Sequence, residues 1–218
     1  MINKCNTMKT FGNKTILENI EEILDPRHTI LVNWDVQNGL VNNIFNKEEF
    51  VENVKKLTDL SRRNGISVLY TKITPLPFQY MTPSSIYSYM KRFGVSDPSK
   101  LPVFMAPGSS DAEIYRDLAP EKDDYVLNKN TASLFIGTNV DNMFKAAGIK
   151  TVIFTGIATE IGVESSARDS GNLGYYTIVA SDSCSSHSKE MHETALKSMS
   201  AISIVMNTKS ILEVLEKR

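Results

Sequence analysis

Short apolar runs alternate with amphipathic stretches along most of this chain, and this alternation constrains the fold more than any other feature. The runs are TILVNW, ISVLYTKI, DYVLN, TVIFTG, YYTIVAS and AISIVM. Each has the length of a strand, and helix-length amphipathic segments separate most of them. The order predicts an α/β fold of three layers, α/β/α and Rossmann-like, with a six-stranded parallel sheet. Right-handed crossovers bring the carboxyl ends of all strands to one edge, where ligands bind in such sheets.

The segments between these runs carry helix signals. Apolar side chains recur at helical spacing in the first of them. Asn46 is predicted to cap this helix, with Glu49 three residues later, and Gly65 to end it. Ser188 and Thr208 are predicted to cap the last two helices. The predicted helices are residues 47–64, 84–93, 140–147, 161–173, 189–199 and 209–216.

The regular pattern breaks between residues 74 and 120, which hold seven of the eight prolines. One short helix at residues 84–93 is expected within this segment. Long irregular segments in compact domains are often functional. Two interpretations stay open: a surface excursion without a role, or a lid or subunit contact.

Composition narrows the function classes. The chain has 218 residues, 41% hydrophobic and 22% charged, with a net charge of −1, as expected of one large globular domain. No basic stripe indicates nucleic-acid binding, and no apolar run approaches the roughly 20 residues of a membrane helix. The first 25 residues contain lysines but no apolar core segment, so they do not resemble a signal peptide. Cys5 and Cys184 do not suggest a disulfide framework, so we expect a cytoplasmic protein.

Three features collect at the predicted carboxyl edge. Asp35 follows the first strand and Lys129 follows the third. The segment TGIATEIGVESSARD, residues 155–169, turns from a strand into a helix, where free N–H groups and the helix dipole favour an anion. Each feature also has an ordinary explanation: a loop-ordering Asp, a surface Lys and a common turn. Together they predict a site in which Lys129 tunes the proton affinity of Asp35.

These features and the segments around them resemble the isochorismatase-like hydrolase superfamily, also called the cysteine hydrolases. The matching segments are LVNWDVQNG, AEIYRDLAP, KNTASLFIGTNVDNMFKAAGIKTVIFTGIATEIGVESSARDSGNLGY and ASDSCSSHSKEMHETALKSM. The superfamily includes nicotinamidases, N-carbamoylsarcosine amidases, ureidoacrylate and biuret hydrolases, and isochorismatases. The resemblance covers residues 29–206 and implies an N-terminal extension, residues 1–28, before one hydrolase domain, residues 29–218.

The resemblance implies roles for individual residues. Asp35 would be the catalytic acid or base and Lys129 its partner. The family's non-proline cis peptide would be Ala158–Thr159, and Thr159 would contribute a backbone N–H to an oxyanion hole. Ala158, Thr159 and Gly162 would bind the substrate.

The nucleophile is where the sequence departs from the family. The amidases carry a Cys at the start of the helix, and this chain has Gly162 in that place, so no thiolate can form an acyl-enzyme there. Cys184 follows another strand and is expected to be a small buried residue. Glu160 stands where the amidases often carry a small or amide residue, and Gly39 replaces a usual Asp.

No metal or other cofactor is predicted. Metal-binding nicotinamidases place Asp and His after the second strand, and the corresponding segment TKITPLPFQY has no histidine. His28, His187 and His192 are scattered along the chain and are expected to be surface or helix residues.

Two functions remain open. The first is a hydrolase that cleaves a vinyl ether or a C–N bond by Asp35/Lys129 acid–base chemistry, with Gly162 leaving room for substrate or water. The second is a family member that kept the pocket and acts as a binding or regulatory protein. The partner in either case would be a small molecule, and family members usually form homodimers or homotetramers. The aromatic residues that either line the site or serve as packing are Trp34, Phe78, Tyr80 and Tyr87.

Overall fold

A six-stranded sheet forms the centre of the molecule in the computed structural model, which describes residues 9–217. Its order is β5-β4-β3-β6-β7-β8, and every neighbouring pair is parallel. The predicted α/β fold with this sheet is therefore confirmed. The strands are β3 (Thr29–Trp34), β4 (Ser67–Ile73), β5 (Tyr125–Lys129), β6 (Thr151–Ile157), β7 (Tyr176–Ser185) and β8 (Ile204–Met206).

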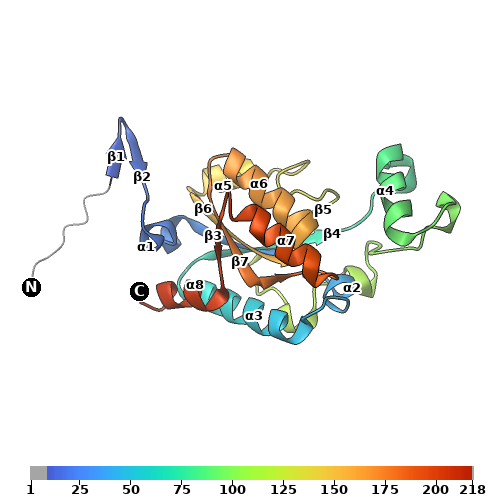
Figure 1. Ribbon diagram of the computed structural model, residues 1–218, viewed down its shortest axis with the longest axis horizontal. Coiled ribbons are helices and arrows are strands. Elements are labelled where there is room, and N and C mark those ends of the chain that lie inside the picture. The colour runs from blue at the N-terminus through green and yellow to red at the C-terminus, as the bar shows by residue number, and fades with distance from the viewer. Residues whose placement is uncertain (1–8, 218) are drawn as a thin grey trace, which may run out of the picture.

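Helices cover both faces of the sheet and complete the three layers (Figure 1). One face packs against α3 (Lys47–Arg63) and α8 (Thr208–Leu215), and the other against α5 (Val140–Ala146), α6 (Glu164–Asn172) and α7 (Lys189–Met199). The strands supply both cores because side chains alternate: Leu31 belongs to the first core, Ile30 and Val32 to the second. A strand that is buried on both faces has a nearly continuous run of apolar residues. This is why the segment TILVNW could be predicted as a strand.

The residues before β3 form a small hairpin and a single helical turn. β1 (Lys9–Phe11) pairs antiparallel with β2 (Lys14–Ile16), and α1 (Ile20–Ile23) and a 3-10 turn, η1 (Pro26–His28), lead into the sheet. Leu17 and Leu24 are buried against the first core. The prediction for Cys5 lies outside the described residues.

The proline-rich segment extends from the body as an arm, residues 74–112. It contains α4 (Pro83–Phe93), which confirms the predicted short helix, and the 3-10 turns η2 (Phe78–Tyr80), η3 (Pro98–Lys100) and η4 (Ser110–Ala112); η5 (Arg116–Leu118) follows it. Figure 1 places α4 in a lobe beyond the end of the sheet. The buried amide of Gln37, just before α2 (Asn38–Val41), donates to the carbonyls of Ile73 and Ala112 and so ties both roots of the arm together.

Two predicted helix caps differ in the structure, where both side chains bond to other segments; Asn46 holds the N-cap position of α3 without the capping bond, and Thr208 lies inside its helix. Asn46 makes no capping hydrogen bond at α3; its Oδ1 instead accepts from Ser185 Oγ at 2.5 Å. Thr208 is already helical in α8, where its hydroxyl donates to Asp182, and Asn207 caps the helix. The predicted Ser188 cap of α7 is confirmed.

The turn after β6 also differs from the prediction. The non-proline cis peptide is Ile157–Ala158, one bond before the expected Ala158–Thr159. The Ala158 carbonyl accepts from the N–H groups of Ile161, Gly162 and Val163, so Ala158 already caps a helix and its following peptide belongs to that helix. The helix opens with a π-helical turn, η6 (Thr159–Val163), two residues earlier than predicted, before α6 begins.

Gly156 is a position where only glycine fits. Its φ is +119°, and a Cβ there would lie 1.9 Å from the Trp34 carbonyl oxygen of the neighbouring strand. Gly156→Ala is expected to lower the free energy of unfolding by about 3 kcal/mol, measured by urea denaturation. Gly171→Ala in α6 is the matched control: a Cβ there meets nothing within 4 Å, and alanine should stabilise the helix by about 0.5–1 kcal/mol. Equal effects at the two glycines would contradict the close approach of β3 and β6.

Candidate active site

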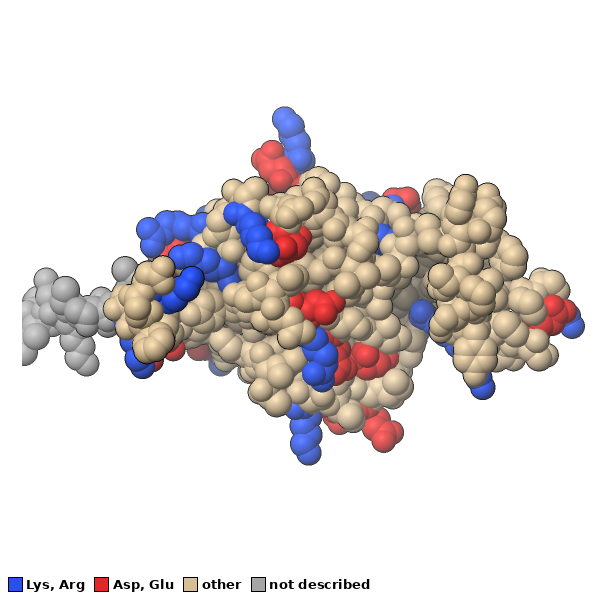
Figure 2. All heavy atoms as spheres, turned by 90° about the horizontal axis from the view of Figure 1, so that it is seen from above, with Lys and Arg blue, Asp and Glu red and all other residues tan. Residues whose placement is uncertain are grey.

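A cavity of about 700 Å³ lies at the carboxyl edge of the sheet, between the body and the arm. The recess between the body and the lobe is visible in Figure 2. The body contributes Trp34, Asp35, Ile157, Ala158 and Glu160, and the arm contributes Met81, Tyr89, Arg92, Phe104 and Met105. Most of these side chains are apolar, with a few polar groups at the sheet edge, which is the usual constitution of a small-molecule site.

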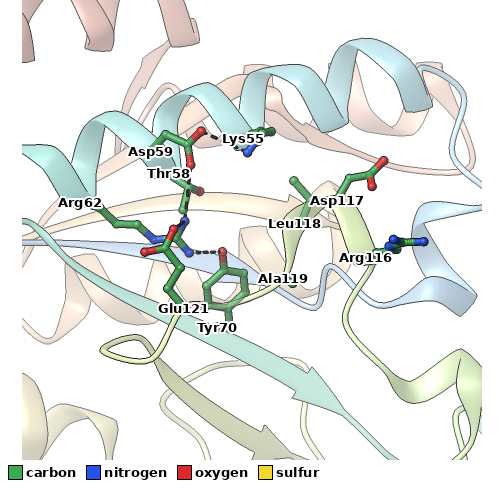
Figure 3. Close-up of a pocket in the computed structure, with 10 residues that line it drawn as sticks. All are labelled: Lys55, Thr58, Asp59, Arg62, Tyr70, Arg116, Asp117, Leu118, Ala119 and Glu121. Atoms are coloured by element: carbon green, nitrogen blue, oxygen red, sulfur yellow. Dashed lines mark hydrogen bonds and ion pairs between the residues drawn. The ribbon is translucent and has the colours of Figure 1, made fainter.

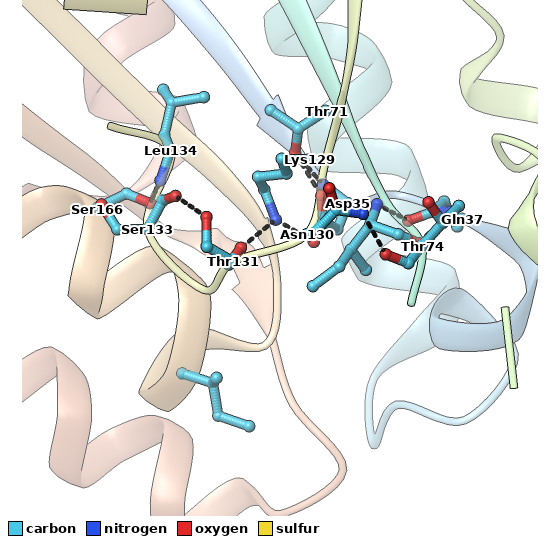
Figure 4. A network of polar contacts seen from close by, with 12 residues as sticks. Asp35, Gln37, Thr71, Thr74, Lys129, Asn130, Thr131, Ser133, Leu134 and Ser166 are labelled. Carbon is cyan, nitrogen blue, oxygen red and sulfur yellow. Dashed lines mark hydrogen bonds and ion pairs between the residues drawn. The ribbon is translucent and has the colours of Figure 1, made fainter. Parts of the chain in front are cut away.

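Asp35 lies where β3 ends, and its side chain is fully buried. Its φ is +47°, a left-handed conformation that costs a non-glycine residue about 1 kcal/mol and occurs often at functional sites. The neighbouring strand β4 holds it there: the Asp35 N–H donates to Thr71 Oγ1 at 2.9 Å, and the Thr71 hydroxyl donates to Asp35 Oδ1. The carboxylate is therefore fixed in position at the edge of the cavity (Figure 4).

Lys129 is the partner of Asp35. It ends β5, its side chain is fully buried, and its Nζ donates to Asp35 Oδ2 at 2.7 Å and to the Thr131 carbonyl at 3.1 Å. The same ammonium lies 3.6 Å from the centre of a Trp34 ring, a favourable cation–π arrangement. The predicted pairing of the two residues is thus present, although 94 positions separate them in the sequence.

Burial shifts both groups toward their neutral forms. Desolvation raises the pKa of Asp35 above its ordinary value, and the charge and hydrogen bond of Lys129 oppose that rise. Desolvation lowers the pKa of Lys129, and Asp35 opposes that change. A carboxyl group with a raised pKa can hold a proton closer to neutral pH, as a general acid must.

Gly162 does not create free space, which corrects the prediction that it leaves room for substrate or water. A Cβ at this position would lie 1.8 Å from Cη2 of Trp34, so the indole occupies the space beside Gly162. Trp34 is only 3% exposed and lines the cavity, whereas Gly162 does not. Asp35, Lys129 and Gly162 do lie in one region. Asp35 and Lys129 pair directly, and the Trp34 indole lies between Lys129 and Gly162.

The other residues of the predicted oxyanion site divide between the cavity and the core. Ala158 lines the cavity. Thr159 is fully buried, and its hydroxyl bonds to the Ser185 carbonyl at 3.1 Å and to His192 Nδ1 at 2.8 Å. The oxyanion role of Ala158, Thr159 and Gly162 remains a prediction.

The arm supplies cavity residues that the sequence reasoning missed. Of the four candidate aromatics only Trp34 lines the cavity; Phe78, Tyr80 and Tyr87 are exposed. One face of α4 lines the cavity, with its residues at i, i+3, i+4 and i+7 spacing, but the sequence alone does not show which face of a helix meets a cavity. The residues of that face are Ser85, Ser88, Tyr89 and Arg92. The arm also explains why a glycine stands at position 39. A Cβ there would lie 2.7 Å from Met105 Sδ, so the arm packs too closely for a side chain.

The remaining candidates have structural surroundings. Cys184 is fully buried, donates weakly to the Phe154 carbonyl, and has its pKa raised by burial, which suits a small packed residue and not a nucleophile. Within residues 9–217 no group of three or more His, Cys, Asp or Glu side chains is placed to hold a metal ion. No helix of the same residues combines the length and apolarity needed to cross a bilayer.

A smaller depression of about 170 Å³ lies beside α3 (Figure 3). Its central cation, Arg62, pairs with Asp124 at 2.5 Å and Glu121 at 3.0 Å and donates to the Tyr70 hydroxyl. The central cation of this depression is therefore committed to ion pairs and a hydrogen bond within the protein.

The three-layer sheet with a buried Asp–Lys pair at its carboxyl edge defines a class, the α/β hydrolytic domains of the isochorismatase type. Comparison with known proteins gives the family: residues 29–210 match the Isochorismatase domain, and the chain belongs to this family. The match starts where β3 starts.

Several relatives are similar over most of their length. Ureidoacrylate amidohydrolase RutB of Acinetobacter baylyi is 30% identical over 79% of this chain and 77% of its own. YwoC of Bacillus subtilis, an isochorismatase family protein, is 29% identical over 80% and 86%. Among solved structures, a cysteine hydrolase from Pseudomonas syringae pv. phaseolicola shares the fold with a TM-score of 0.77 at 19% identity, covering 94% of this chain and 99% of that one.

Removing the cation of the buried pair should be costly. Lys129→Met leaves the Asp35 carboxylate buried without compensation, and we expect a loss of about 3–5 kcal/mol of unfolding free energy at neutral pH. Without Lys129 the pKa of Asp35 rises further, so the folded state retains the proton, and the loss should shrink as the pH falls below that raised pKa. Urea denaturation at several pH values measures both effects. Lys145→Met, which breaks only a surface pair with Asp141, is the control and should change little. A pH-independent loss in Lys129→Met would contradict the interpretation.

Trp34 and Gly162 should be energetically coupled. Gly162→Ala forces a Cβ into the indole and is expected to cost about 1–3 kcal/mol. Trp34→Val removes the obstacle, so the double variant Trp34→Val/Gly162→Ala should lose less than the sum of the two single variants. A double-mutant cycle in urea tests this, and strict additivity would show that the two residues are independent.

Proposed function

We propose that this protein is a small-molecule hydrolase in which Asp35, with Lys129, performs acid–base chemistry without a cysteine nucleophile. The buried Asp35–Lys129 pair at the wall of the cavity is the observation that carries the proposal. Family membership supports hydrolysis, and the name of the RutB relative supports cleavage of a C–N bond. Gly162 in the place of the family's Cys argues against an acyl-enzyme.

Two reactions fit the pair. In vinyl-ether cleavage the Asp35 carboxylic acid would donate its proton to the vinyl carbon, water would add to the resulting oxocarbenium ion, and the hemiketal would break down to a carbonyl compound and an alcohol. In C–N cleavage the Asp35 carboxylate would take a proton from water as it attacks the carbonyl, and the same proton would pass to the departing nitrogen. Lys129 would balance the charge of the carboxylate in both cases.

A binding protein without turnover is the second candidate function. The indole of Trp34 fills the space beside Gly162, which supports a cavity adapted away from the chemistry of the thiol-bearing relatives. The ligand would still be a small molecule, because the cavity holds about 700 Å³. Assembly into a homodimer or homotetramer remains a prediction from the resemblance.

Asp35→Asn separates the enzyme from the binding protein. The wild type and the variant are assayed against a panel of vinyl ethers, small ureas and amides, with product release as the readout. We expect kcat/KM of the variant to fall by roughly 10²–10⁴-fold, because a carboxamide neither donates nor accepts the proton. Asp59→Asn on the exposed side of α3 is the control and should retain full activity. No wild-type turnover, with ligand quenching of the Trp34 fluorescence, would instead establish the binding protein.

The pH dependence distinguishes the two reactions. If protonated Asp35 is the acid, kcat/KM is high at low pH and falls as the pH rises through the raised pKa of Asp35. If ionised Asp35 is the base, kcat/KM rises through the same pKa. The role of Asp35 predicts an inflection in the wild-type profile that is missing in Asp35→Asn. If the two profiles have the same inflections, this role is overturned.

A further inference from the structure

A second carboxylate lines the same cavity and has an unused acceptor. Glu160 is the second residue of η6, and its Oε1 accepts from Ser186 Oγ at 2.7 Å. Its Oε2 is buried and has no hydrogen-bond partner among the described residues. The carboxylate is thus partly desolvated, and no group within residues 9–217 compensates this oxygen.

The orientation of this carboxylate is fixed from behind. Ser186 is fully buried, and its Oγ accepts from the Ser188 N–H at 3.3 Å while its hydroxyl donates to Glu160. Ser188 also caps α7, so the support is part of the fold and not a flexible surface contact. The Glu160 carboxylate is therefore held in a defined orientation.

No cation in the part of the chain that the structure describes forms an ion pair with Glu160, and Lys129 is committed to Asp35 at 2.7 Å. Burial lowers the pKa of His192, which favours its neutral form at neutral pH, and its Nδ1 is engaged with Thr159. Arg92, also at the cavity, is exposed and stacks on the Phe104 ring at 5.1 Å.

The surrounding wall increases the preference of Glu160 for a positive charge. Apolar side chains make up most of the cavity, among them Leu40, Ile73, Leu76, Ile157 and Ile161. Charge–charge attraction is stronger in such surroundings than in water. The Asp35–Lys129 pair is neutral overall, so Glu160 is the carboxylate of the body wall whose charge is left unbalanced.

We propose that Glu160 binds a positively charged nitrogen group of the ligand, so that the cavity selects small organic cations with an apolar body. The apolar part of the ligand would contact the arm and the ends of the strands, and its ammonium or amidinium would lie beside the Glu160 carboxylate and be attracted by its charge. This inference rests on the proposed function only in taking this cavity as the ligand site, and it defines the class of ligand that the site accepts.

A matched pair of probes tests the proposal by binding alone. n-Butylammonium and n-butanol have the same apolar chain and differ in charge. Trp34 is the protein's only tryptophan and lines the cavity, so its fluorescence reports occupancy. We expect the wild type to bind n-butylammonium roughly tenfold more tightly than n-butanol, and this preference to weaken in high salt. Glu160→Gln should reduce the preference to less than about threefold.

Glu164→Gln is the matched control, because it removes a carboxylate one turn later that pairs with Arg168 outside the cavity, and it should keep the wild-type preference. Ser186→Ala is a second variant for the case that Glu160→Gln does not fold. It keeps the charge of Glu160 but removes the hydrogen bond that orients the carboxylate, so we expect a preference between those of the wild type and Glu160→Gln. Equal affinity of the wild type for the two probes, or an unchanged preference in folded Glu160→Gln, would overturn the proposal. Because the readout is binding, this failure is distinct from an absence of turnover in the Asp35 experiment.

Discussion

The buried ion pair between Asp35 and Lys129 is the interaction on which the rest of the site depends. Its two side chains come from the ends of β3 and β5, with Thr71 of the intervening β4 bonded to the same carboxylate. Neither charge is tolerable without the other at this depth, because desolvation costs each ion several kcal/mol. The pair therefore requires the parallel register of these three strands, and the sheet in turn places the pair at the edge where the cavity opens.

Trp34 gives the site its individual character. Its indole contacts the Lys129 ammonium on one side and fills the volume beside Gly162 on the other. A large side chain on β3 and a missing side chain on η6 are thus complementary. The space beside Gly162 is therefore filled and is not a hole in the cavity wall. Glu160, two residues before Gly162, adds a carboxylate to the cavity wall.

The local sequence pattern predicted the structure correctly where a side chain interacts within its own helix or strand. It failed where the side chain bonds to a distant segment. The strands and the helix α4 followed from apolar runs and periodicity. Asn46 and Thr208 had the correct residue types for helix caps, but Ser185 and Asp182 recruit them across the fold. The aromatics of the arm were misjudged for the same reason, since exposure of Phe78 depends on where the whole arm lies.

The sequence by itself determined the α/β class, the parallel sheet and the placement of Asp35 and Lys129 at strand ends, because period, strand length and the position of a polar residue at a strand end are local properties. Only the tertiary structure decided what surrounds them. The indole beside Gly162, the arm across the carboxyl edge and the unpartnered oxygen of Glu160 arise from contacts between segments far apart in the chain. Such contacts depend on packing in three dimensions, which leaves no periodic signal in one dimension.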